Sequence, residues 1–171
     1  ALVARLADPE SNLAAWGGMV FPVSLVVEAP VVMLLSASTA LSKDWRSYKT
    51  LRRYMMAAGA VLTAVHMLIA FTPLYWWVAG TVIGAPKEIL ESGRIGMMIM
   101  TPWTWTIAYR RFQQGAMIRF GHSKAVGTGT IIRLAANAAV LITGYLLKEV
   151  PGIIVASAAV ATGVTIEAIY A

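Results

Sequence analysis

The chain has 171 residues, of which 58% are hydrophobic and only 13% are charged. Its charges occur in short groups between long apolar runs, a pattern typical of a polytopic membrane protein and not of a soluble domain. The sequence contains no cysteine, which excludes disulfides, thiolate metal sites and cysteine nucleophiles. In a soluble protein the net charge of +6 would suggest nucleic acid binding, but here basic loops that stay in the cytoplasm explain it better.

Five apolar stretches are long enough to cross a bilayer, so we predict an all-α, polytopic transmembrane helix bundle. The expected spans cover about 17–41, 54–80, 94–120, 127–147 and 153–171. A polar segment with a helix cap near Asp8 or Ser11 precedes the first span. Small residues at the end of that span, in the run SASTAL, predict close packing against another helix.

The connecting segments predict the orientation of the bundle. Segments 43–53 and 110–124 are strongly basic and are expected inside, whereas the loops near residues 8, 87 and 149 are weakly charged and are expected outside. We therefore expect a multi-pass protein of the cytoplasmic (inner) membrane, with the N-terminus of this chain outside and its C-terminus inside. An odd number of spans with an external start implies a further helix before Ala1.

Glu28 is the most unusual residue of the first span. It lies near the middle of the span, with Ser24 one helical turn before it on the same face. Pro30 cannot donate a backbone hydrogen bond and is expected to free the Val26 carbonyl as an acceptor close to Glu28. A carboxyl group there either exchanges a proton or cation, or is held by a neighbouring helix to fix the packing.

The third span carries polar residues directly into an apolar run. One face, spaced by three and four residues, contains Trp103, Ile107, Arg110, Gln114 and Met117. If this face lines a central cavity, Arg110 and Gln114 offer donors to an anionic or polar solute. Alternatively, Arg110 extends to the lipid headgroups, as we expect for Arg111.

A kink with an aromatic wall at Trp103 is expected where Thr101 and Pro102 interrupt the same span.

Three more polar residues lie within the spans. Asn137 is central in the fourth span and either joins helices or contributes to a cavity. His66, in the second span, is either a proton relay or a neutral, hydrogen-bonded packing residue. Glu167, near the inner end of the fifth span, is expected to pair with a basic residue.

No catalytic or cofactor motif is visible in the sequence. A phosphate-binding Gly-rich loop, a nucleophilic Ser elbow, a His-Glu-x-x-His motif and a catalytic carboxylate pair are all missing, so we do not expect an enzyme. The histidines, His66 and His122, are far apart in sequence, so no metal site is expected either. Transport by this chain would draw on an ion gradient.

Several patterned segments carry a family resemblance. These are LAAWGGMVFPVSLVVEAPVVMLLSASTAL, KDWRSYKTLRRYMM, AGAVLTAVHMLIAFTPL and PWTWTIAYRRFQQGAMIRFG. Together they resemble bacterial relatives of the progressive ankylosis protein, which are similar to the multidrug and toxic compound extrusion (MATE) transporters of the flippase-like exporter superfamily. The likeness covers essentially the whole chain.

The resemblance implies a protein of about twelve helices, in which two six-helix bundles rock around a central cavity. The five spans would be helices two to six of the first bundle, and the second bundle would follow Ala171 and be the main partner of this chain. The carboxylate that often serves cation coupling in MATE proteins lies on the first helix, so that role does not transfer to Glu28.

These observations lead to one main hypothesis and two alternatives. We expect a secondary transporter that exports a small organic solute by alternating access coupled to H⁺ or Na⁺, without a bound cofactor. The arginines of the third span would suit an anionic solute. The alternatives are a flippase for a lipid-linked substrate and a membrane scaffold or assembly subunit that transports nothing.

Overall fold

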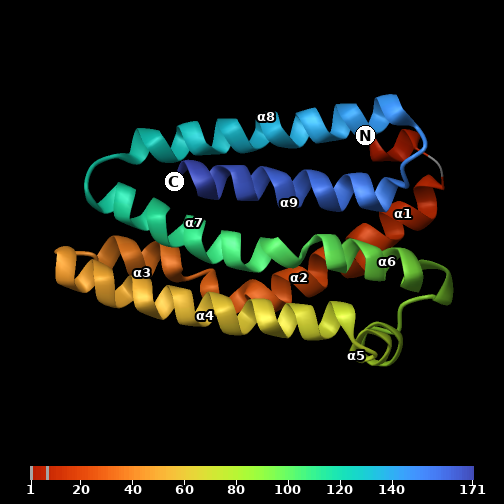
Figure 1. The fold of residues 1–171 in the computed structure, drawn as a ribbon, viewed down its shortest axis with the longest axis horizontal. Coiled ribbons are helices and arrows are strands. Elements are labelled where there is room, and N and C mark those ends of the chain that lie inside the picture. Colours follow the sequence, from red (N-terminus) through yellow and green to blue (C-terminus); the bar gives the residue numbers. More distant parts are fainter. Residues whose placement is uncertain (1, 7) are drawn as a thin grey trace.

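Long helices lie side by side in this structure, a computed structural model that describes residues 2–6 and 8–171. Almost all of these described residues are helical, and no strand occurs among them. In Figure 1 the hairpin of α8 (Ser123–Leu147) and α9 (Gly152–Tyr170) lies along one side of α7 (Thr101–Arg119), and α3 (Leu34–Leu41) and α4 (Trp45–Phe71) lie along the other. The long helix α7 therefore occupies the centre of the bundle.

The first membrane-length helix, Pro9–Leu41, is irregular in its hydrogen bonding. After a short 3₁₀ turn, η1 (Val3–Arg5), it passes through α1 (Pro9–Ala15), the π-helical η2 (Trp16–Val20), α2 (Phe21–Glu28), the 3₁₀ turn η3 (Ala29–Val31) and α3. Asp8 occupies the N-cap position, as one of the two predicted caps, although its side chain makes no capping hydrogen bond. Helical structure thus starts at Pro9, before the predicted start of the span at residue 17.

Helix α4 begins at Trp45, nine residues before the predicted start near residue 54. A capping box explains the early start: Asp44 Oδ1 accepts a hydrogen bond from the Ser47 amide at 2.8 Å, and Ser47 Oγ accepts one from the Asp44 amide at 3.0 Å. Lys and Arg are good helix formers, so the basic segment continues the helix and is not a loop.

The Asp44 cap should make the start of α4 sensitive to acid. Its hydrogen bonds from the Ser47 backbone and side chain hold the pKa of the Asp44 carboxyl below its usual range. A lowered pKa means that the cap stabilises the folded state above the ordinary Asp pKa and that this stabilisation is lost as the pH falls through the folded pKa. Asn caps equally well without titrating, so the melting temperature of the wild type should fall below that of Asp44→Asn only in acid. A difference that does not change with pH would contradict this assignment.

Helix α4 ends at Phe71 and is followed by Pro73, α5 (Leu74–Trp76) and the π-helical η4 (Trp77–Val82). Arg94 ties this end to the next helix: its guanidinium donates to the carbonyls of Ala70 and Phe71 at 3.3 and 3.4 Å and lies over the Trp76 ring. These carbonyls belong to the last turn of α4 and have no partner within the helix, so Arg94 satisfies them. The second span therefore ends at Phe71, and residues up to 80 are not part of the same straight helix.

The segment predicted as the third span consists of α6 (Lys87–Ile99) and α7, which are separated at Met100. Pro102 has no amide hydrogen, so the Met98 carbonyl accepts instead from Thr101 Oγ1 at 2.7 Å. The interruption predicted at Thr101 and Pro102 is therefore present. Helix α6 begins at Lys87, so much of the predicted loop 81–94 is helical.

Four helical segments are long and apolar enough to cross a membrane, in the part of the chain that the structure describes. They are Pro9–Leu41, Trp45–Phe71, Ser123–Leu147 and Gly152–Tyr170. These bounds agree with the predicted first, second, fourth and fifth spans in position. The interrupted α6–α7 segment is not among them, so the count of five spans and the arrangement of a six-helix half stay predictions.

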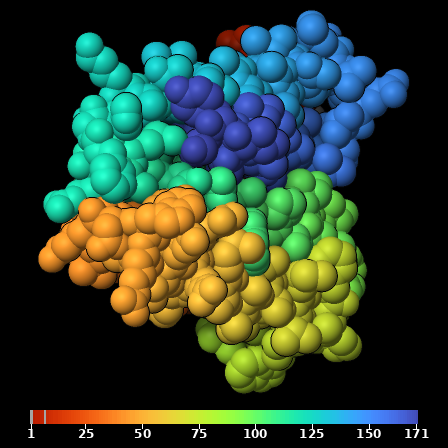
Figure 2. Space-filling model, turned by 60° about the vertical axis from the view of Figure 1, so that its left-hand side comes forward, coloured from red at the N-terminus to blue at the C-terminus, as the bar shows by residue number. Residues whose placement is uncertain are grey.

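Close packing joins the helices along α7 and along the α8–α9 hairpin. Gly115 on α7 lies directly against the backbone of α3, where Thr39 Oγ1 donates to the Gly115 carbonyl at 3.2 Å. The small residues at the end of the first span thus pack closely, as predicted. Figure 2 shows α9, in dark blue, seated between α8 and the elements around α7.

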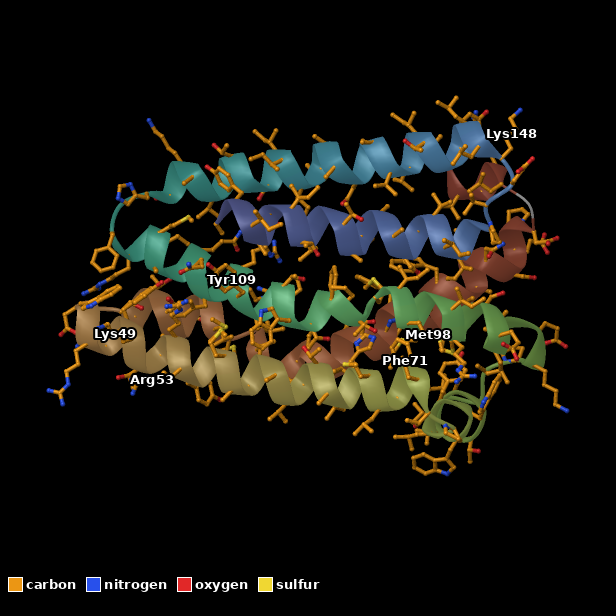
Figure 3. All side chains as sticks on the ribbon, in the orientation of Figure 1. Lys49, Arg53, Phe71, Met98, Tyr109 and Lys148 are labelled. Carbon is orange, nitrogen blue, oxygen red and sulfur yellow. The ribbon has the colours of Figure 1, made fainter. Side chains whose placement is uncertain are left out.

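The two ends of the bundle differ in charge. Figure 3 shows Lys49 and Arg53 at the end where α4 begins, and Lys148 at the opposite end. The first end also carries Lys43, Arg46 and Arg52, whereas the second contains Glu88, Glu91 and Glu149 beside its basic residues.

Candidate functional site

Glu28 is a buried carboxyl group at an interruption of the first helix. It is the last residue of α2, its residue exposure is 2%, and η3 follows directly. Among the described residues Glu28 Oε2 is in no hydrogen bond of good geometry, and the Trp103 indole N–H, which acts on this carboxyl, is likewise buried without a well-formed hydrogen bond. Arg111 and then Arg110 are the cations whose fields act on it most. A buried carboxyl without full hydrogen bonding is costly, and such groups are concentrated at functional sites.

The neighbours predicted for Glu28 on its own helix are placed differently. Ser24 is fully buried, but its hydroxyl contacts Met97 Sδ at 3.9 Å, on α6, and no hydrogen bond joins it to Glu28 in the described structure. The Val26 carbonyl accepts from the Ala29 amide, so the expectation that Pro30 leaves this carbonyl free is wrong. The 3₁₀ turn at η3 shortens the hydrogen-bond ring and supplies the missing donor.

Glu167 on α9 gathers polar side chains from two other helices. Arg110 Nη1 of α7 donates to Glu167 Oε2 at 2.9 Å, and Gln114 Nε2 donates to Oε1 at 3.1 Å. Arg133 Nε of α8 lies 3.1 Å from the same Oε2. Residue exposure is 1% for Glu167, 9% for Arg110 and 6% for Gln114. We call Arg110, Gln114, Arg133 and Glu167 the Glu167 cluster.

The Glu167 cluster contains two guanidinium groups and one carboxylate. The buried Nε of Arg110 has no hydrogen-bond partner among the described residues, and Arg133 Nε is ion-paired with Glu167 Oε2 without the angle of a hydrogen bond. The predicted pairing of Glu167 with a basic residue is confirmed. The connection that Glu167 makes between α7, α8 and α9 was not predicted from the sequence.

Most of the face of α7 that was expected to line a cavity is covered by protein in this structure, and Met117, at the end of that face, is half-buried. Trp103 is buried and packs edge-on against Phe21 of α2, with ring centres 6.1 Å apart. Arg110 and Gln114 are directed to Glu167. A cavity-facing role for these side chains stays a prediction. Arg111 is half-buried, and its Nε is buried without a hydrogen-bond partner in the described residues. Its positive charge also acts on the Glu28 carboxyl.

His66 is fully buried and both of its ring nitrogens are engaged. Nε2 lies 2.9 Å from the Met97 carbonyl oxygen and Nδ1 lies 3.2 Å from Thr104 Oγ1. Because a carbonyl only accepts, Nε2 carries a proton, and in the neutral ring Nδ1 accepts from Thr104. This geometry agrees with the packing interpretation, while a proton relay through His66 stays a prediction.

Asn137 joins α8 to α9. With its amide oriented to satisfy its surroundings, Nδ2 donates to the carbonyls of Ala159 at 2.8 Å and Arg133 at 3.1 Å. Gly163 lies opposite, where a larger side chain would collide with the amide. These contacts favour the interpretation of Asn137 as an interhelical link.

The sequence contained a signal for the Glu167 cluster that our prediction did not use. Arg133 and Glu167 lie at nearly equal distances in sequence from the turn between α8 and α9, and Arg110 and Arg133 do so from the turn between α7 and α8. In antiparallel neighbours such residues lie at the same depth. Combining this symmetry with the charges would have brought the three residues together.

Comparison with known proteins adds no relative. No protein-family model, no curated protein and no solved structure matches the chain.

Proposed function

We propose that this chain forms part of a membrane transporter for a small organic solute, with Glu28 as the group that binds the solute or its coupling ion. The observation that carries the proposal is the buried Glu28 carboxyl, with Oε2 in no hydrogen bond of good geometry among the described residues, at a break in a membrane-length helix. Transporters of several folds place solute and ion sites at such breaks, where the irregular backbone lines the site. Charged groups within membrane spans are also rare unless they are functional.

The coupling step requires the electrostatic surroundings of Glu28 to change. Arg111 and Arg110 supply positive charge near the carboxylate, so a proton or Na⁺ arriving at Glu28 would compete with these arginines. An anionic solute would instead compete with Glu28 for the arginines. In both cases the exchange depends on the Glu28 carboxylate, and export by alternating access follows if the exchange is accompanied by a change in helix packing.

A scaffold or assembly subunit is the second candidate. It is favoured by the engagement of Arg110 and Gln114 with Glu167, since polar side chains so used hold helices together and are not available to a solute. On this alternative the orphaned oxygen of Glu28 has no role in transport.

Replacement of Glu28 by glutamine should reduce gradient-driven flux at least tenfold. The full-length protein would be reconstituted into vesicles that enclose a pH-sensitive dye, and an H⁺ or Na⁺ gradient would be imposed. Uptake of radiolabelled succinate would then be measured, with tetraethylammonium as a cationic comparison. Glu28→Asp keeps the carboxylate and should retain part of the flux. Glu88→Gln, at an exposed position of α6, is the matched control and should behave as the wild type. Wild-type flux in Glu28→Gln would exclude the role of Glu28, and the absence of any gradient-dependent flux in the wild type would favour the scaffold.

A further inference from the structure

One end of the bundle carries an uncompensated group of cations. Lys43, Arg46, Lys49, Arg52, Arg53, Arg119 and Lys124 are all exposed there. None of them belongs to an ion pair among the described residues, where both ion pairs end on Glu167. The single carboxylate in the neighbouring segment, Asp44, is used as the cap of α4. These positive charges therefore attract anions from outside the protein.

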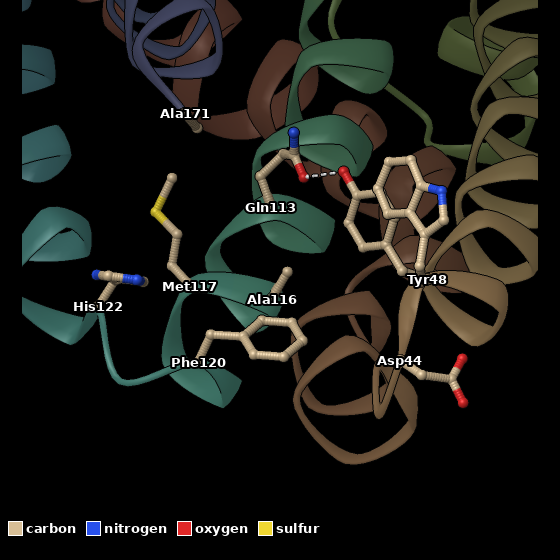
Figure 4. A pocket seen from close by; sticks show the side chains of 9 residues that line it. Asp44, Tyr48, Gln113, Ala116, Met117, Phe120, His122 and Ala171 are labelled. Carbon is tan, nitrogen blue, oxygen red and sulfur yellow. Dashed lines mark hydrogen bonds between the residues drawn. The ribbon is translucent and has the colours of Figure 1, made fainter.

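An apolar groove opens at the same end. It has a volume of about 460 Å³ and lies between the start of α4, the end of α7 and the end of the chain. Its walls include Trp45, Tyr48, Ala116, Met117 and Phe120. Figure 4 shows Met117 and Phe120 on one side of the groove and Tyr48, hydrogen-bonded to Gln113, on the other. The size and apolar walls suit a stretch of hydrocarbon chain.

The cations border this groove directly. Lys43 and Arg46 flank Asp44 and Trp45 of its lining, and they also line a second cavity of about 490 Å³ that shares Asp44 with it. Lys49 lies with its ammonium 5.0 Å from the centre of the Trp45 ring. Arg119 precedes Phe120. An occupant of the groove would thus have an apolar part between the helices and an anionic part among Lys43, Arg46 and Lys49.

We propose that this end of the bundle binds an anionic phospholipid, with an acyl chain in the groove and the phosphate held by Lys43 and Arg46. Basic residues beside a gap between membrane helices are a recognised means of binding anionic headgroups. The positive charge of Lys43 and Arg46 favours phosphatidylglycerol-type lipids over zwitterionic ones. Because the groove has room for an acyl chain, we expect one lipid bound at a defined site and not a diffuse layer of counterions. This site is separate from Glu28 and does not depend on transport.

Lipid retention by the purified full-length protein tests the proposal. Delipidated protein in detergent would be titrated with dioleoylphosphatidylglycerol or dioleoylphosphatidylcholine, and bound lipid counted by native mass spectrometry. We expect one phosphatidylglycerol to be retained at least tenfold more tightly than phosphatidylcholine. Lys43→Gln with Arg46→Gln should weaken it about twenty-fivefold, because each cation near an anionic surface is worth about a fivefold change in affinity. The matched control, Lys87→Gln with Lys148→Gln at the opposite end, should leave it unchanged.

A groove-filling variant tests the seat of the acyl chain. Met117→Trp leaves every charge in place but should lower phosphatidylglycerol retention at least tenfold, and soluble glycerophosphoglycerol should not compete for the site. Circular dichroism of each variant would verify that the helices are intact, and Met117→Leu provides a conservative second variant that should retain the lipid. Equal retention of the two lipids, equal losses in the two charge variants, or full retention by Met117→Trp would each overturn the proposal. A groove occupied by another part of the protein would retain neither lipid and would also overturn it.

Discussion

Glu167→Ala is expected to lower the free energy of unfolding by about 3–5 kcal/mol, the usual cost of removing one partner from a buried ion pair. Without this carboxylate the guanidinium of Arg110 and the amide of Gln114 stay buried and lose their acceptor, and Arg133 loses its counter-charge. The packing of α9 against α7 and α8 should loosen first, because Glu167 contacts both helices. Denaturant unfolding of the detergent-solubilised protein, followed by circular dichroism, measures the change.

The exposed residue Glu88 provides the comparison, since Glu88→Ala removes a carboxylate of the same type with no ion pair among the described residues. It should change the unfolding free energy by no more than about 0.5 kcal/mol. A further variant replaces Glu167, Arg110 and Arg133 together by methionine. It should recover most of the stability, because an apolar set of similar volume avoids the burial of unpaired charge. Equal effects of Glu167→Ala and Glu88→Ala would show that the Glu167 cluster does not hold the helices together.

Gly115→Ala is the second change for which we expect a large loss of stability, of about 2–3 kcal/mol. A Cβ atom at this position would overlap the Leu35 carbonyl oxygen and lie 2.6 Å from the Ser38 Cβ. These contacts are with the backbone and the base of a side chain, so no flexible group can move aside, and α3 must separate from α7. The same movement would lengthen the hydrogen bond from Thr39 Oγ1 to the Gly115 carbonyl.

Gly127→Ala, in helix α8, is the matched control for this prediction. A Cβ there meets no atom within 4 Å, so the substitution should leave stability unchanged or raise it by about 1 kcal/mol through helix propensity. Thermal unfolding of both variants, with the oligomeric state checked by size-exclusion chromatography, measures the difference. If Gly115→Ala were as stable as Gly127→Ala, the close approach of α3 and α7 would be incorrect.

The sequence was informative about helices and less so about their ends. Hydropathy located the four membrane-length helices because each contains a long apolar run, and Pro102 marked the interruption between α6 and α7. The start of α4 lies earlier than hydropathy predicts, because the basic residues before the apolar run are helical and the capping box of Asp44 and Ser47 precedes them.

Only part of the candidate site was predictable from the sequence. Helical spacing correctly placed Arg110 and Gln114 on one face of the third span, but spacing alone does not reveal what lies opposite that face. Their acceptor, Glu167, is more than fifty residues away and required the packing of α9 on α7. Burial of Glu28 was expected from its position, whereas its orphaned oxygen depends on which side chains surround it.

The interruption at Met100 has an electrostatic consequence for the centre of the bundle. Two shorter helices, α6 and α7, each have their own dipole, so the negative C-terminal end of α6 lies inside the protein and not at a surface. A buried helix end needs donors for its last carbonyls. The N–H of His66 Nε2, directed at the Met97 carbonyl, supplies one of them. His66 therefore caps a helix end inside the bundle, and this role explains the burial of the histidine without proton transfer.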